Sequence, residues 1–186
     1  AQSRLLEEKL IASNIPYKIV GGVNFYSRKE VKDLLAYLKT VDNAQDELAV
    51  RRIINIPKRG IGAASLAKVS AYAEVNSLNF YQALERAREI PGLGRAAGKM
   101  EPFVDLIASL RELAALGGVS AVLEEVLEQT GYVRELEAED TPEAQARIEN
   151  IDELMNKAIS YEQENEEPTL SGFLEEVALV ADIDSL

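Results

Sequence analysis

Residues 103–118 read FVDLIASLRELAALGG, and this stretch is the clearest structural signal in the chain. Its large apolar side chains recur every three or four positions, which is the period of a helix with one buried face. They are Phe103, Leu106, Ile107, Leu110 and Leu113. The glycine pair at 117 and 118 then ends the pattern. The stretch therefore predicts a long amphipathic helix that lies against a core.

The same helical period continues on both sides of this stretch. Helices are predicted at residues 4–13, 31–41, 48–54, 65–75, 79–87, 119–127 and from 142 onward. Ser27 and Glu30 have the spacing of a capping box at the start of the second of these helices. Thr141 followed by Pro142 is a typical helix start. Residues 162–167 are expected to form an acidic loop, and Thr169 or Ser171 to cap the last helix.

One short segment near the N-terminus does not fit a helix. Residues 17–20 read YKIV and favour a β-strand, which the two following glycines end. A single strand cannot form a sheet, so we expect it to pair with sequence outside this chain. The chain also begins at Ala1 without a methionine. The expected fold is mainly α, with one short N-terminal strand, in a piece of a longer protein.

Composition excludes several kinds of chemistry. The 186 residues contain no cysteine and no histidine, which removes disulfides, thiol chemistry and the commonest metal ligands. No apolar run approaches a membrane span and no signal peptide is visible, so we expect a cytoplasmic protein without membrane contact. The net charge of −12 is divided unequally: residues 1–111 carry +5 and residues 112–186 carry −17. Any nucleic-acid surface is therefore expected in the first part.

Two glycine-containing turns stand in that first part. Residues 55–62 read NIPKRGIG and open a helix, and residues 91–95 read PGLGR and open another. Glycines let a ligand approach the backbone, and free amides at a helix N-terminus attract anions. The two turns could thus hold one nucleic-acid backbone at two points. In the alternative interpretation they only connect helices, and Ile61 and Leu93 fill the core.

The sequence offers no catalytic or metal site. A Walker-type phosphate loop is absent. The GLGRAAG run at residues 92–98 resembles a dinucleotide-binding pattern, but it follows a predicted helix and not a strand. The acidic pairs Glu124–Glu125 and Glu175–Glu176 are adjacent on helices and point to different sides. We therefore expect no enzymatic activity from this segment alone.

Several blocks of the chain closely resemble the UvrD/PcrA/Rep helicases, which are superfamily 1 DNA helicases that move 3′ to 5′. These blocks are IPYKIVGG at 15–22, FYSRKEVKD at 25–33, RIINIPKRGIG at 52–62 and RIENIDEL at 147–154. The order of the blocks also fits, the likeness covers the whole chain, and it is closest to the PcrA type.

The resemblance implies a place within the longer protein. Residues 1–40 would lead in from the second RecA-like motor domain (2A) and would include the leftover strand. Residues 41–170 would form the helical 2B subdomain, and residues 171–186 would return towards 2A. ATP and Mg would bind the intact parent outside this segment, which itself would hold no cofactor. The 2B body would swivel on hinges near residues 40–43 and 170–186.

The resemblance also implies a role for the glycine turns. In this family the first turn contacts the duplex backbone ahead of the single/double-strand junction, and a second basic contact lies in the other turn. The residues that would meet DNA are Lys58, Arg59, Gly60, Ile61, Gly62, Ser65 and Arg95. The other partners would be the remaining helicase subdomains. An alternative is a protein-interaction module, in which the acidic C-terminal half docks accessory proteins that load or activate the helicase.

Overall fold

The computed structural model describes residues 24–185, with side chains to residue 183. These residues form helices and no strand, so the mainly helical prediction is confirmed for this part. The predicted strand at 17–20 and the helix at 4–13 lie outside the described residues. The elements are η1 (Phe25–Ser27), α1 (Lys29–Asp42), α2 (Glu47–Ile53), α3 (Ala63–Val75), α4 (Phe80–Glu85), η2 (Ala87–Glu89), α5 (Ala96–Ala114), α6 (Ser120–Thr130), α7 (Tyr132–Glu139), α8 (Pro142–Glu164) and α9 (Leu170–Ser185).

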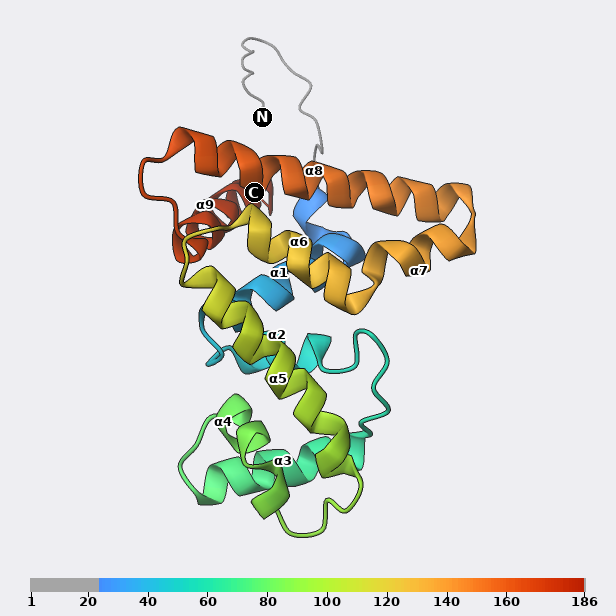
Figure 1. Ribbon diagram of the computed structural model, residues 1–186, viewed down its shortest axis with the longest axis vertical. Coiled ribbons are helices and arrows are strands. Elements are labelled where there is room, and N and C mark those ends of the chain that lie inside the picture. Colours follow the sequence, from blue (N-terminus) through green and yellow to red (C-terminus); the bar gives the residue numbers. More distant parts are fainter. Residues whose placement is uncertain (1–23, 186) are drawn as a thin grey trace.

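Two lobes share one long helix. In Figure 1 the upper lobe contains α1 and α6 to α9, while α3, α4 and the start of α5 form the lower lobe. Helix α5 runs diagonally from one lobe to the other, and α2 lies beside it between them. Residues 103, 107 and 110, predicted to face a core, are fully buried along α5. The helix whose apolar face the sequence predicts is thus the element that joins the two lobes.

Helix α1 is the centre of the upper lobe, where it contacts α5, α6, α8 and α9. It is buried on almost every side, including Leu34, Tyr37 and Leu38, each with no exposed surface. Its carboxylate Asp33 is only 1% exposed and accepts hydrogen bonds from Arg52 (2.9 Å) and from the Tyr132 hydroxyl (2.6 Å). Because the buried charge is fully partnered, it fixes α2 and α7 against α1.

Three predictions about helix ends can be checked directly. Thr141 caps α8 by accepting from the Ala144 amide at 3.0 Å, as predicted. Of the two candidates at the last helix, Thr169 is the cap, because its hydroxyl accepts from the Gly172 amide. The capping box at Ser27 is wrong: Ser27 donates to the Asn24 carbonyl, and Arg28 occupies the cap position without a side-chain bond.

The predicted acidic loop begins later than expected. Helix α8 continues to Glu164, and Glu162 turns inward to accept hydrogen bonds from the Val119 amide (2.6 Å) and the Ser120 hydroxyl (2.5 Å). Partial burial pushes the pKa of Glu162 upward, but the hydrogen bonds outweigh it and hold that pKa below its ordinary value. Glu162 therefore caps α6 from a distant part of the chain.

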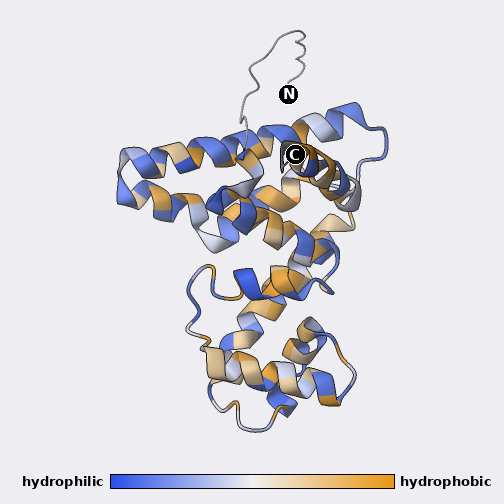
Figure 2. Cartoon of the chain, turned by 180° about the vertical axis from the view of Figure 1, so that it is seen from behind, coloured by the Kyte–Doolittle hydropathy of each residue, from blue (hydrophilic) through white to orange (hydrophobic). Residues whose placement is uncertain are grey.

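The helices differ in how much apolar side-chain surface they expose to solvent. Figure 2 shows that α8, on the outside of the upper lobe, is mostly hydrophilic. The end of α9 is different, because Leu179 and Ile183 are each 66% exposed. In the described residues, no helix combines the length and apolar character needed to cross a bilayer.

Candidate nucleic-acid interface

The first glycine turn, residues 55–62, is held from inside by a side-chain amide. Asn55 donates to the Ile61 carbonyl at 2.8 Å and accepts from the Ile61 amide at 3.0 Å. Ile61 is 3% exposed, so its side chain does fill the core as the alternative interpretation expects. Gly60 has a φ of +73°, which L side chains rarely adopt. The turn is a rigid, preformed structure.

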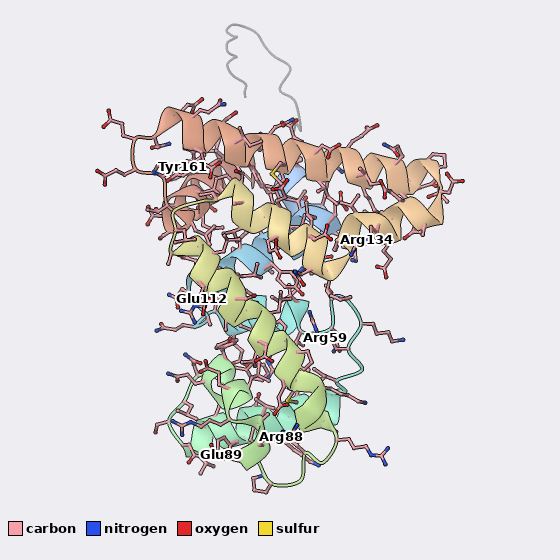
Figure 3. The ribbon with its side chains drawn as sticks, in the orientation of Figure 1. Arg59, Arg88, Glu89, Glu112, Arg134 and Tyr161 are labelled. Carbon is pink, nitrogen blue, oxygen red and sulfur yellow. The ribbon has the colours of Figure 1, made fainter. Side chains whose placement is uncertain are left out.

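Arg59 points into the molecule and not into solvent (Figure 3). Its guanidinium donates to the carbonyls of Ile53 (3.0 Å), Ile54 (2.8 Å) and Ile56 (3.3 Å), which lie at the end of α2 and just beyond it. It also donates to the Tyr37 hydroxyl at 2.9 Å. Arg59 therefore caps α2 and secures the turn to α1.

Two aromatic side chains also contact the groups around Arg59. The Arg59 guanidinium carbon lies 5.0 Å from the centre of the Phe103 ring, within range of a cation–π interaction. The Tyr37 hydroxyl in turn donates to the Ile56 carbonyl. Burial raises the pKa of Tyr37, and the nearby Arg59 charge opposes that shift only in part. The hydroxyl therefore stays protonated and keeps its hydrogen bond at neutral pH.

The remaining groups of the first turn face outward. Lys58 is exposed, and within the described residues it makes no hydrogen bond or ion pair. Gly62 occupies the cap position of α3, which has no side-chain cap, so the first amides of the helix keep their donors. A Cβ built on Gly62 would meet nothing within 4 Å. Ser65 lies half-buried in the first turn of the same helix.

The second turn shares several features with the first. Leu93 is buried, with 6% of its surface exposed, while Gly92 and Gly94 have φ values of +83° and +59°. Arg95 occupies the cap position of α5, which again has no side-chain cap. Its side chain is exposed and has no hydrogen-bond or ion-pair partner in the part of the chain that the structure describes. Each turn thus combines a buried apolar residue with an exposed cation ahead of a helix. The helix starts differ, however, because the first three amides of α5 already donate to the carbonyls of residues 93–95.

The two turns lie side by side. Helices α3 and α5 begin on the same side of the lower lobe (Figure 1), and the Lys99 ammonium of α5 lies 3.4 Å from the Gly60 carbonyl. All seven residues of the predicted site belong to this region. In these neighbouring turns Arg59 and Ile61 point inward. The other site residues are exposed, except that Ser65 is half-buried; they are Lys58, Gly60, Gly62, Ser65 and Arg95.

Charged residues are distributed unequally between the two lobes. Near the second turn, Glu101 is paired with Arg88 at 2.6 Å, and this pairing lowers the pKa of the Glu101 carboxyl. The acidic residues of α7 and α8 belong to the upper lobe, whereas both glycine turns lead into helices of the lower lobe (Figure 1). No group of three or more potential metal ligands occurs in residues 24–185. The arrangement is suited to holding an anionic backbone.

Two lysines at this surface were not singled out by the sequence pattern. Lys68 of α3 donates to the Gly92 carbonyl at 2.7 Å, and Lys99 of α5 approaches the Gly60 carbonyl. Lys68 stands six residues after Gly62, and Lys99 stands five residues after Gly94. That spacing alone does not show that a lysine reaches the other turn, because the contact depends on how the two helices pack.

Comparison with known proteins identifies the family. Residues 1–185 match the UvrD-like helicase C-terminal domain. The chain is 44% identical over 186 residues to the ATP-dependent DNA helicase PcrA of Bacillus subtilis (strain 168), covering 100% of this chain and 25% of that protein. It is also 44% identical over 186 residues to the ATP-dependent DNA helicase PcrA of Staphylococcus aureus (strain Mu50), covering 99% of this chain and 26% of that protein. A Staphylococcus epidermidis PcrA is 41% identical, also with 99% and 26% covered.

The matches span almost the whole chain, whereas the chain spans only about a quarter of the length of these relatives. The family match covers both glycine turns and every described helix. The chain therefore belongs to the family of UvrD-like helicase C-terminal domains.

Proposed function

We propose that this chain is the accessory and regulatory 2B subdomain of an ATP-dependent 3′–5′ DNA helicase, with flanking pieces of 2A. The proposal is supported by the family and by relatives that are named ATP-dependent DNA helicases. In this proposal ATP and Mg act in the remainder of the parent, and this segment supplies DNA contacts. Residues 1–40 are the lead-in, residues 41–170 the body and residues 171–186 the return.

The packing of α1 bears on where the hinge lies. Helix α1 (Lys29–Asp42) is buried among α5, α6, α8 and α9, so a hinge at residues 40–43 would leave it behind when the body turns. A rigid-body rotation is better accommodated by pivots in segments with few packed contacts. We therefore favour a body that includes α1, so that the lead-in ends before Lys29 rather than at residue 40, and we keep the second pivot near the end of α9.

The observation that carries the proposed DNA contact is the pairing of the two turns. Lys58 and Arg95 are exposed cations without partners in the described residues. Lys58 lies in the turn that leads into α3, and Arg95 occupies the cap position of α5. We propose that these two charges and the amides around Gly60, Gly62 and Ser65 bind phosphates of duplex DNA. Phosphate contacts carry no direct sequence information, so binding is expected to be independent of base sequence.

Within this proposal, two of the seven site residues have a supporting role. Ile61 anchors the turn in the core, and Arg59 fixes it to α2 and α1 through backbone carbonyls and Tyr37. These residues set the position of the turn, and their neighbours meet the phosphates. Rotation of the body would then move both turns together, toward duplex DNA or away from it.

The test is fluorescence anisotropy with a labelled duplex that carries a 3′ single-stranded tail. We expect weak, salt-sensitive binding that Lys58→Ala/Arg95→Ala removes. The matched control is Lys32→Ala/Lys39→Ala, which deletes two exposed charges from α1 in the other lobe. Equal losses in both double variants would mean that only overall charge matters, and they would overturn the assignment of the contact to the turns.

A further inference from the structure

The two glycine turns are tied to each other by a reciprocal pair of lysines. Lys68 stands on α3, the helix that the first turn opens, and it donates to the Gly92 carbonyl of the second turn at 2.7 Å. Lys99 stands on α5, the helix that the second turn opens, and it donates to the Gly60 carbonyl of the first turn at 3.4 Å. Each helix therefore holds the turn that precedes the other helix.

Both acceptors lie at the glycines with the unusual backbone. Gly60 and Gly92 have φ values of +73° and +83°. A Cβ at position 92 would lie 3.4 Å from the Lys68 ammonium and 3.7 Å from its Cε, so this lysine runs directly over the turn. A Cβ at position 60 would lie 3.6 Å from the Lys99 ammonium. The lysines thus contact the residues whose conformation defines each turn.

We propose that Lys68 and Lys99 are positioning residues that join the two turns into one phosphate-binding unit of fixed geometry. The ligand of this unit is a pair of phosphates on one nucleic-acid duplex. This inference rests on the proposed function for its DNA part, while the bracing itself is a property of the free protein.

Bracing matters because binding at two points is strongest when the spacing is set in advance. A charged donor on a carbonyl forms a stronger hydrogen bond than a neutral one does. Turns that are already held in place lose less freedom when the ligand arrives, and the second contact forms at a high effective concentration. Without the lysines, the spacing between the two turns would have to be set by the DNA itself.

The bracing is tested first without DNA, by comparing amide resonances of the 186-residue chain and its single variants. We expect Lys99→Met to shift the Ile61 amide, which shares a peptide bond with the Gly60 carbonyl. We expect Lys68→Met to shift the Leu93 amide in the same way. If each substitution shifts only the turn that precedes its own helix, the reciprocal brace does not exist and the proposal is overturned.

The second test measures duplex binding by anisotropy. Each Lys→Met change is expected to weaken binding roughly two- to fivefold, the range for an exposed charged contact. The matched control is Arg86→Met, which removes an exposed charge from the same lobe without touching either turn. Losses no larger than the control's would overturn the proposal. If the unaltered chain fails to bind, the proposed function fails, while the resonance shifts still decide whether the brace exists.

Discussion

Replacing Arg59 with methionine should destabilise the fold far more than replacing its exposed neighbour. The guanidinium donates to three carbonyls at the end of α2 and to the Tyr37 hydroxyl, at 2.8–3.3 Å. Leaving such groups without a partner costs about 1–3 kcal/mol for a buried one. Arg59 is only half-buried, so water can replace some of these bonds. The Phe103 contact adds roughly 0.5–1 kcal/mol.

Together these terms predict a loss of about 2–4 kcal/mol in the free energy of unfolding. Urea denaturation followed by circular dichroism measures it. With a slope of about 2 kcal/mol per molar urea, the midpoint should fall by about 1–2 M. The control is Lys58→Met, whose side chain is exposed and unpartnered in the described residues and whose cost should stay within about 0.5 kcal/mol.

The reverse pattern would refute this reasoning. If Arg59→Met unfolds at the same urea concentration as Lys58→Met but loses duplex binding, the guanidinium does not secure the turn and instead faces DNA. Arg59→Lys sharpens the comparison, because one ammonium cannot reproduce a fork that reaches several carbonyls and a hydroxyl. It should recover only part of the lost stability.

Three further substitutions test individual positions. Gly62→Ala should leave the free energy of unfolding within about 0.5 kcal/mol, because its Cβ meets nothing, yet it should weaken duplex binding; unchanged binding in anisotropy would contradict a close phosphate approach. Gly172→Ala should lower stability by about 1–3 kcal/mol in thermal melts, since the new Cβ overlaps the Tyr161 hydroxyl, and an unchanged melt would show that the ring moves aside. The pKa of Glu162 is lowered by folding, so its stabilisation is full above its ordinary value of 4.5 and disappears as pH falls through the lower, folded value. Glu162→Gln should flatten that acid-side decline in urea midpoints, and identical pH profiles would remove Glu162 as the cap of α6.

The local period of apolar residues is sufficient to predict most of the helices from the sequence. The stripe on α5 and the cap at Thr141 depend on residues within one or two turns of each other, and both are confirmed. Ser27 and Glu30 have equally good local spacing, but Glu30 instead accepts a hydrogen bond from Asn150, 120 residues away in the sequence. No local pattern indicates that competing contact. The cap of α6 by Glu162 is missed for the same reason.

The candidate site likewise combines features that are local in the sequence with contacts that depend on packing. Glycines, cations and helix starts are local features, so the sequence alone selects both turns. Which cation faces outward is not a local property. Arg59 and Lys58 are adjacent in the sequence, but Arg59 is drawn inward by the carbonyls of α2 and by Tyr37 on α1. The reciprocal contacts of Lys68 and Lys99 likewise exist only once α3 and α5 have packed.

The most direct test of the central claim is the salt dependence of duplex binding. Each phosphate contact contributes about 0.9 to the slope of log affinity against log salt. Lys58→Ala and Arg95→Ala should therefore each lower that slope by about 0.9, while Lys39→Ala leaves it unchanged. If both turn variants keep the slope of the unaltered chain, the two glycine turns do not bind the DNA backbone.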